Sequence, residues 1–197
     1  MIITISRECG SGGHSIAAKV AEKLGVPCYD KEIIAEVSEK CKISKEYAEE
    51  AGELYTGGYI HHTLGDNNYA YPYSTPSLRD QINSTQVDVI LELAAKGDCV
   101  IIGRGADYIL RKRDDVINVF IKASMEYKVE QALIKHDLSS KDAAKILAKR
   151  DRERSKHYYF YTGRTWGDIK NYDLVLDSGS LGEDKCVNLI CEAAKKQ

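Results

Sequence analysis

The 197-residue chain lacks the features that nucleic-acid-binding, membrane and disulfide-rich proteins depend on. Its 28 lysines and arginines are outnumbered by 30 acidic residues, and a net charge of −2 argues against a general nucleic-acid binder. No apolar run approaches the roughly 18 residues of a membrane-spanning helix. The six cysteines form no C-x-x-C pair and have no histidine at zinc spacing, which predicts reduced thiols. Because the first residues also lack a signal-peptide pattern, we expect a cytoplasmic protein without nucleic-acid or membrane partners.

Apolar segments that fit strands alternate with segments of helical period along the whole chain. This alternation predicts an α/β domain over residues 1–197, with a parallel sheet covered on both faces. The predicted strands are the N-terminal run and residues 26–29, 99–102, 116–121 and 172–177. The predicted helices are residues 15–24, 31–40, 44–53, 78–97, a short one ending near 112, 125–136, 141 into the 150s, and 182–196.

The segment MIITISRECGSGGHSIA combines an apolar run, a glycine-rich turn and the start of a helical pattern. Such a turn directs several backbone N–H groups and the positive end of a helix dipole toward one point, where an anion binds. The alternative is a strand-to-helix turn whose glycines serve only close packing. The candidate phosphate-binding residues are Gly10, Ser11, Gly12, Gly13, His14 and Ser15.

The usual phosphate-loop pattern, G-x-x-x-x-G-K-[ST], has no lysine in this chain. Aligned without gaps from Arg7, the pattern places Gly13 at the lysine position, and shifted by one residue it places His14 there. A phosphate site in this loop would therefore need positive charge from another part of the chain.

Arginines stand in two places suited to supply that charge. Arg104 lies in a Gly-Arg-Gly turn after an apolar strand, where it could hold a phosphate or simply close a surface turn. Arg150, Arg152 and Arg154 alternate with acidic residues in a predicted helix. These three are either a solvated face or part of a mobile lid over a triphosphate.

Residues 54–77 are rich in tyrosine, glycine, asparagine and proline and show no sustained period, which predicts a long loop. Loops of this length in a compact domain are usually functional or mobile, although surface packing or a contact between copies in a homo-oligomer is a comparable reading. His61 and His62 have no acidic or cysteine partner at ligand spacing, so we interpret them as surface residues.

The order of the motifs resembles the cytidylate kinase-like branch of the P-loop nucleoside monophosphate kinases. The segments that carry the resemblance are ISRECGSGGHS, YDK at 29–31, GR at 103–104, VFIKAS at 119–124, RDRERS at 150–155 and YDLVLDS at 172–178. The resemblance implies a P-loop kinase-like three-layer sandwich with a five-stranded parallel sheet. It also implies a lid region at 139–171, an acceptor-side helix and loop at 44–77, ATP and Mg²⁺ as phosphoryl donor, and a small phosphate acceptor such as CMP.

In the leading hypothesis the chain is a small kinase. The glycine loop would hold the phosphates, Ser15 would bind Mg²⁺, and the catalytic candidates are Arg150, Arg152, Arg154 and His14. The predicted acceptor-binding residues are Asp30, Arg79 and Arg104.

The chain departs from the family at several positions besides the lysine. Ile102 and Gly105 flank the GR pair where acidic groups are expected, and Arg154 and His157 stand where aspartate and arginine are expected. These departures favour a second hypothesis, a degenerate nucleotide-binding protein that regulates without turnover. A third is a structural domain that holds only an anion.

Overall fold

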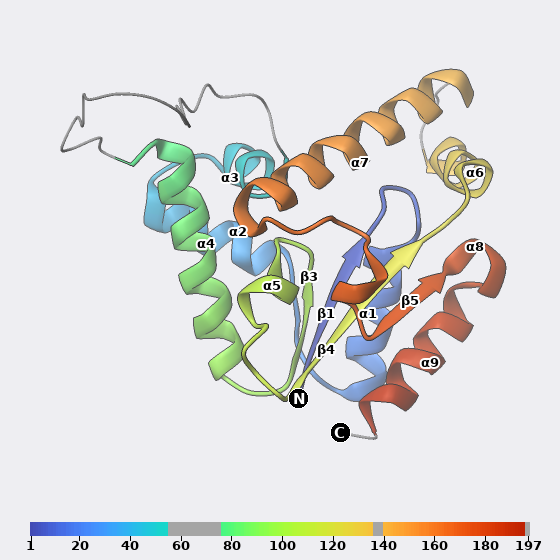
Figure 1. Ribbon diagram of the computed structural model, residues 1–197, viewed down its shortest axis with the longest axis horizontal. Helices are drawn as coiled ribbons and strands as arrows, with labels where there is room; N and C mark the ends of the chain where they lie inside the picture. Colours follow the sequence, from blue (N-terminus) through green and yellow to red (C-terminus); the bar gives the residue numbers. More distant parts are fainter. Residues whose placement is uncertain (55–75, 136–139, 196–197) are drawn as a thin grey trace.

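The computed structural model describes residues 1–54, 76–135 and 140–195. Within these ranges five parallel strands form one sheet in the order β2-β3-β1-β4-β5 (Figure 1). β1 lies at the centre, between β3 and β4, so its carboxyl end opens between two neighbouring strand ends. The strands are β1 Ile2–Arg7, β2 Cys28–Tyr29, β3 Cys99–Ile102, β4 Val116–Lys122 and β5 Leu174–Asp177.

Alternate residues of the strands face two apolar cores, because successive side chains of a strand point to opposite faces. Ile3 and Ile5 of β1 pack in the core that contains residues of α1 and α9. Ile2 packs in the other core, with residues of α2, α3, α4 and α5. Helices therefore cover both faces (Figure 1), which confirms the three-layer α/β sandwich. The helices are α1 Gly13–Leu24, α2 Lys31–Cys41, α3 Lys45–Glu53, α4 Leu78–Ala95, α5 Ala106–Ile109 and α9 Glu183–Ala194.

Two helices lie beyond the carboxyl ends of the strands instead of covering a face. α6 (Met125–Lys135) follows β4, and α7 (Ser140–Thr162) packs against α6 and reaches α3 (Figure 1). The remaining described elements are a 3-10 helix, η1 (Ile169–Asn171), and the short helix α8 (Ser178–Leu181). α7 thus covers the edge of the sheet where ligands of open α/β folds bind.

The predicted elements are present, with differences at their ends. α1 begins at Gly13, before the predicted residue 15, and α7 continues to Thr162, past the 150s. β5 begins at Leu174 because residues 169–171 first form a 3-10 turn, which the strand pattern does not reveal. The helix α8 is not among the predicted elements.

Part of the predicted long loop cannot be compared with the structure. Residues 55–75, including His61 and His62, lie outside the described residues. The described part of the acceptor-side segment consists of Ser44, α3 and Leu54 on one side of this gap, with Pro76 and Ser77 on the other. All six cysteines are free thiols, as predicted. In the part of the chain that the structure describes, every helix is too short or too polar to cross a membrane.

Candidate functional site

The glycine loop, residues 7–15, joins β1 to α1 at the carboxyl edge of the sheet. Gly10 and Gly12 have φ values of 84° and 75°, in the left-handed region that glycine adopts without strain. Two hydrogen bonds fix the conformation of the loop: Ser11 Oγ donates to Glu8 O at 2.9 Å, and Ser178 Oγ donates to Ser11 O at 2.6 Å. Five of the six predicted phosphate-binding residues line an adjoining cavity, which we call the loop cavity: Gly10, Gly12, Gly13, His14 and Ser15. The sixth residue, Ser11, belongs to the same loop but is fully buried.

The two alignments of the phosphate-loop pattern give the lysine position to different residues of α1. Gly12 is the left-handed residue before the helix, and Gly13 is the first helical residue. In the ungapped alignment the lysine position falls on Gly13, and Arg7 holds the position of the first glycine. A β-carbon added to Gly13 would collide with Arg7 Cβ and lie 2.8 Å from Arg7 Cγ. The side chain of Arg7 therefore fills the space where a residue-13 side chain would begin.

The two residues that follow Gly13 face different neighbours. His14 Nε2 lies 3.4 Å from Asp30 Oδ2, near the end of β2. Ser15 Oγ donates to Glu183 Oε2 at 2.8 Å, and the same oxygen accepts from Lys19 Nζ at 3.0 Å. A hydroxyl and a carboxylate are hard oxygen ligands of the kind that Mg²⁺ takes together with substrate phosphates and water. The described residues contain no group of three His, Cys, Asp or Glu that could hold a metal alone. Ser15 and Glu183 therefore fit a metal that is shared with phosphate groups.

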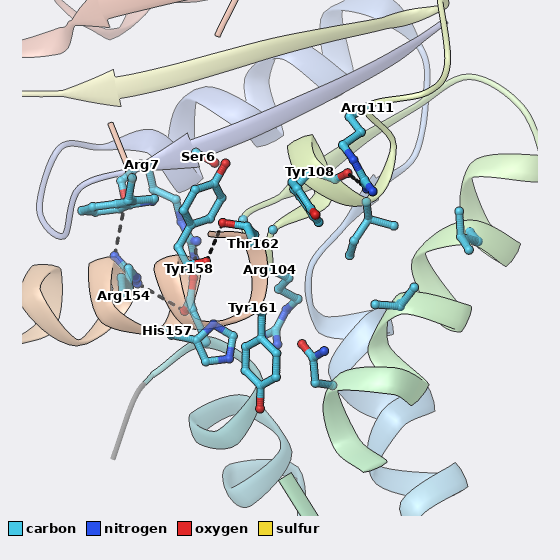
Figure 2. Close-up of a pocket in the computed structure, with 18 residues that line it drawn as sticks. Ser6, Arg7, Arg104, Tyr108, Arg111, Arg154, His157, Tyr158, Tyr161 and Thr162 are labelled. Carbon is cyan, nitrogen blue, oxygen red and sulfur yellow. Dashed lines mark hydrogen bonds and ion pairs between the residues drawn. The ribbon is translucent and has the colours of Figure 1, made fainter. Parts of the chain in front are cut away.

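A second cavity, which we call the aromatic cavity, lies beside the loop cavity and is shown in Figure 2. Tyrosines 108, 158 and 161 and Trp166 line it together with Val87, Leu91 and Ile109. Its cations are Arg7, Arg104, Arg111 and Arg154. Arg7 and Arg154 also line the loop cavity, so these two arginines stand at the boundary between the two spaces.

Arg7, Glu53 and Arg154 form an ionic group that we call the arginine cluster. The Glu53 carboxylate accepts from Arg7 Nη1 through Oε1 and from Arg154 Nη2 through Oε2, the latter at 3.3 Å. Arg154 Nη1 also donates to the Arg7 carbonyl at 3.4 Å (Figure 2). Burial raises the pKa of Glu53, but Arg7, Arg154 and Arg104 outweigh it and hold that pKa below its usual range. Glu53 is therefore ionised at neutral pH, and the cluster carries two positive charges against one negative.

Arg104 is almost fully buried in the aromatic cavity's wall, with a left-handed φ of 57°. Its Nη1 donates to Gln86 Oε1 at 3.0 Å, and its Nη2 lies 3.6 Å from Asp30 Oδ1. Asp30 therefore lies between Arg104 and His14 at the end of β2. The Nε atoms of Arg104 and Arg154 are buried and have no hydrogen-bond partner among the described residues. Two guanidinium groups at this edge thus contain a buried donor that is unpaired among the described residues.

Uncharged and weakly charged groups complete the aromatic cavity. Burial lowers the pKa of His157 to about 4, so its imidazole is neutral at pH 7. Tyr158 Oη donates to Asp107 Oδ2 at 2.6 Å, and burial raises the pKa of both groups. The cavity therefore combines aromatic side chains, neutral polar groups and guanidinium groups, and Arg111 Cζ lies 3.8 Å from the centre of the Tyr108 ring.

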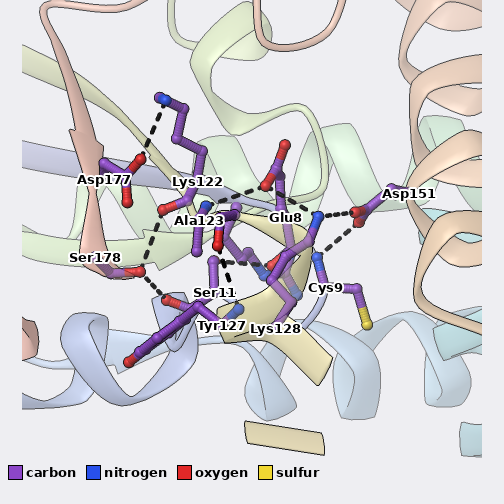
Figure 3. Close-up of polar contacts among 12 residues, drawn as sticks. Glu8, Cys9, Ser11, Lys122, Ala123, Tyr127, Lys128, Asp151, Asp177 and Ser178 are labelled. Carbon is purple, nitrogen blue, oxygen red and sulfur yellow. Dashed lines mark hydrogen bonds and ion pairs between the residues drawn. The ribbon is translucent and has the colours of Figure 1, made fainter. Parts of the chain in front are cut away.

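A different ionic group, the lysine cluster, lies on the other side of the glycine loop (Figure 3). Lys128 of α6, only 4% exposed, donates through Nζ to Glu8 Oε2 at 3.1 Å and to Asp151 Oδ2 at 2.9 Å. The two carboxylates also accept backbone N–H groups, Glu8 from Ala123 at 3.1 Å and Asp151 from Cys9 at 2.6 Å. Through these contacts α6 and α7 hold the loop from its outer side.

The structure brings together only part of the predicted site. Arg150 lines the loop cavity and Arg154 lines both cavities, whereas Arg152 is exposed and lines neither. Of the predicted acceptor residues, Arg104 lines the aromatic cavity, and Asp30 stands behind it. Arg79 lines neither cavity.

Sequence reasoning missed two residues at the boundary, Arg7 and Glu53. Arg7 had a signal, because an arginine stands where the phosphate-loop pattern has its first glycine. Glu53 had none, because it ends a helix whose approach to β1 depends on tertiary packing.

Comparisons with known proteins agree with this architecture. A sequence profile described as the Cytidylate kinase-like family matches residues 2–180. The cytidylate kinase of Pyrobaculum aerophilum is 24% identical over 189 residues, which cover 96% of this chain and 90% of that protein.

Solved structures extend the comparison to the fold. The crystal structure of an uncharacterized protein from Eubacterium ventriosum is similar with a TM-score of 0.76 and 26% identity, covering 100% of this chain and 99% of that one. Shikimate kinase from Bacteroides thetaiotaomicron is similar with a TM-score of 0.57 and 12% identity, covering 99% and 98% of the two chains. The last likeness concerns the fold alone.

Proposed function

Because the chain belongs to the cytidylate kinase-like family, we propose that it is an ATP-dependent phosphotransferase acting on a small phosphorylated acceptor. A nucleoside monophosphate such as CMP is the first candidate for that acceptor. One observation carries the proposal. The loop cavity and the aromatic cavity adjoin, and two arginines, Arg7 and Arg154, are among the lining residues of both. A phosphoryl group passing between two substrates needs positive charge at such a boundary.

The loop cavity suits the triphosphate of the donor. Backbone N–H groups of residues 10–14 and the start of α1 would hold the phosphates, and Arg150 of α7 also lines this cavity. When bound, Mg²⁺ would neutralise phosphate charge, and Ser15 and Glu183 are the residues that would hold it. We assign the lid to the region at 139–171, because α7 covers the strand ends and carries Arg150 and Arg154.

The aromatic cavity suits an acceptor with a planar ring and an anionic end. Tyr108, Tyr161 and Trp166 offer surfaces against which a ring can stack, and neutral His157 offers a polar contact without charge. Arg7 and Arg154 would receive the acceptor phosphate. In transfer, an acceptor phosphate oxygen bonds to the γ-phosphorus while the bond from that phosphorus to the β–γ bridging oxygen breaks. The electron pair of the broken bond stays on ADP, and an ionised acceptor phosphate has no proton to lose.

The alternative function is regulation by nucleotide binding without turnover. It is supported by the absence of the pattern's lysine, since the two alignments give that position to Gly13 or to His14. Under this alternative, ATP binds in the loop cavity and α7 closes over it, and no product forms.

The test is an ADP-release assay with ATP and Mg²⁺ against a panel of nucleoside monophosphates and small phosphorylated metabolites. We expect turnover with at least one nucleoside monophosphate. Stabilisation of the protein by ATP without ADP release from any acceptor would favour the regulatory alternative. If ATP neither stabilises the protein nor yields ADP with any acceptor, the remaining hypothesis is a structural domain that holds only an anion.

A matched pair of glycine variants tests the loop cavity itself. Gly12→Val should abolish ATP binding, because the new side chain would meet Glu183 Oε1 at 2.7 Å from its β-carbon and intrude on the phosphate site. Gly25→Val is the control, since Gly25 has a similar φ of 67° but open space around it. Calorimetry should show ATP binding in the control alone. Equal affinity in both folded variants would mean that the loop is a packing turn.

A further inference from the structure

We propose that Arg7 supplies, from the end of β1, the positive charge that a phosphate-binding loop usually supplies from a lysine at the start of its helix. The inference rests on the proposed function and names the residue that would replace the missing lysine. In the ungapped alignment, arginine replaces the first glycine of the pattern and glycine replaces the lysine. Compared with the pattern, the positive charge therefore stands at residue 7 and not at residue 13, and the glycine stands at residue 13 and not at residue 7.

The packing of Arg7 against Gly13 explains why the two changes occur together. The Cβ and Cγ of Arg7 lie where a side chain at residue 13 would begin. A lysine at residue 13 and an arginine at residue 7 would therefore collide in this backbone. The chain has room for one long cationic side chain at this point, and Arg7 occupies it.

The guanidinium of Arg7 lies where the transferred group would pass. From β1 it extends over the end of β3, so that a β-carbon added to Gly103 would lie 3.1 Å from Arg7 Cζ. It lines both cavities, and Figure 2 shows it next to Arg154, beside the tyrosines of the aromatic cavity. A charge at this boundary can contact both the γ-phosphoryl group and the acceptor phosphate.

The arginine cluster keeps positive charge available although it contains a carboxylate. Glu53 accepts one N–H group from Arg7 and one from Arg154, and each guanidinium has five such groups. Arg154 Nε has no partner among the described residues. Glu53 therefore orients the two arginines without neutralising both, as preorganised charge stabilisation requires.

Other nearby cations suit this role less well. Lys128 is bound between Glu8 and Asp151 on the other side of the loop. Lys19 pairs with Glu183 and Asp184 and is nearly half exposed. Arg150 is exposed and lines only the loop cavity, so it reaches the donor and not the boundary.

The test first removes the positive charge at residue 7 and then restores a positive charge at residue 13, the position of the lysine in the pattern. Arg7→Gln should lower kcat by about 10²-fold or more, with a smaller change in the KM for ATP, as for loss of one preorganised donor. Arg7→Gly should be similarly impaired, and the double variant Arg7→Gly/Gly13→Lys should recover at least tenfold in kcat. Arg113→Gln, whose arginine pairs with Asp115 outside both cavities, is the control and should match the parent.

Thermal unfolding provides a readout that does not depend on activity. In the parent protein, Gly13→Ala should lower Tm, because the added methyl group collides with Arg7. In the Arg7→Gly variant, the same substitution at residue 13 should not lower Tm further. Normal kcat in folded Arg7→Gln, or no recovery in the folded exchange variant, would overturn the inference while leaving the kinase function in place. If the parent turns over no acceptor, the proposed function fails. In that case the ATP affinity of Arg7→Gln tests the role of Arg7. An affinity equal to that of the parent would overturn the assignment of Arg7 to phosphate binding, and a tenfold lower affinity would support it.

Discussion

The arginine cluster and the lysine cluster both tie the end of β1 to α7, but they differ in charge and in what remains unpaired. Arg7 and Glu8 are neighbours in the chain and point into different clusters. Their partners on α7, Arg154 and Asp151, lie about one turn apart. The arginine cluster holds two cations around one carboxylate, whereas the lysine cluster holds two carboxylates around one cation.

This difference separates a binding site from an anchor. In the lysine cluster both carboxylates also accept backbone N–H groups, from Ala123 and Cys9, so the group holds the loop in place. In the arginine cluster a buried guanidinium nitrogen has no partner among the described residues, and the surplus charge faces two cavities. An arrangement that leaves buried donors unpaired is costly unless a ligand completes it.

The lysine cluster should give the largest effect on stability. Lys128→Met would leave Glu8 and Asp151 facing each other without their cation, and we expect the free energy of unfolding to fall by about 3 kcal/mol. Urea unfolding at neutral pH measures this. Lys40→Met is the control, because Lys40 pairs with Glu92 at the surface, where an exposed ion pair contributes little to stability. Equal losses in the two variants would remove the distinction between anchor and surface pair.

Variants of the arginines of α7 that line the cavities should affect turnover. Replacing Arg150 and Arg154 together with alanine should lower kcat by about 10²-fold, equivalent to about 2.7 kcal/mol of transition-state stabilisation. ATP binding should fall much less, because the loop N–H groups and Mg²⁺ hold the ground state. Steady-state kinetics and calorimetry on the same variant separate the two quantities.

A double variant at the same spacing on α7 controls for loss of charge alone. Lys145→Ala/Lys149→Ala removes two exposed cations four residues apart, and neither lines a cavity. Its kcat should stay within about twofold of the parent, because exposed charges act weakly at this range. Normal turnover of the Arg150/Arg154 variant would mean that these two arginines do not supply the charge, which leaves Arg7 as the remaining arginine that lines both cavities.

The smallest expected effect concerns His157, beside the arginine cluster. Its folded pKa is about 4, against about 6.5 in the unfolded chain, so between these values the unfolded chain binds a proton that the folded one excludes. Stability should therefore fall as pH decreases, by about 2 kcal/mol between pH 6.5 and 4.5. His157→Gln should flatten this part of the stability curve. The lowered pKa of Glu53 reduces stability only below its unfolded pKa of about 4.3, where the unfolded chain begins to take up the proton, and this lies outside the window.

The fold was predictable because local patterns and the parallel topology suffice for it. Apolar runs such as Cys99–Ile102 end at glycine, and their alternation with helices requires a parallel sheet. The end of α7 was not predictable from period, because Tyr159 and Phe160 are exposed while Tyr158 is buried. The family resemblance implied five parallel strands but not their order, and the order β2-β3-β1-β4-β5 was not predicted because no local pattern specifies which strands pair.

The candidate site was predictable where a residue directly follows a strand. The glycine loop and Arg104 follow β1 and β3, and parallel strands bring those ends to one edge. The aromatic walls were not predictable, because Tyr108, Tyr161 and Trp166 come from separate elements that only packing brings together. Spacing on α7 placed Arg150 and Arg154 on one face but could not distinguish that face from the side that carries Arg152.

The contact of Arg7 with two glycines has a consequence for the evolution of such loops. Gly13 and Gly103 are far apart in the chain, yet the same side chain excludes a methyl group at both. Relatives with arginine at position 7 should keep glycine at 13 and 103, and relatives that regain a lysine at 13 should have a small residue at 7. These three positions would then covary as a unit, and an alignment could sort the family into lysine-type and arginine-type loops before any enzyme is purified.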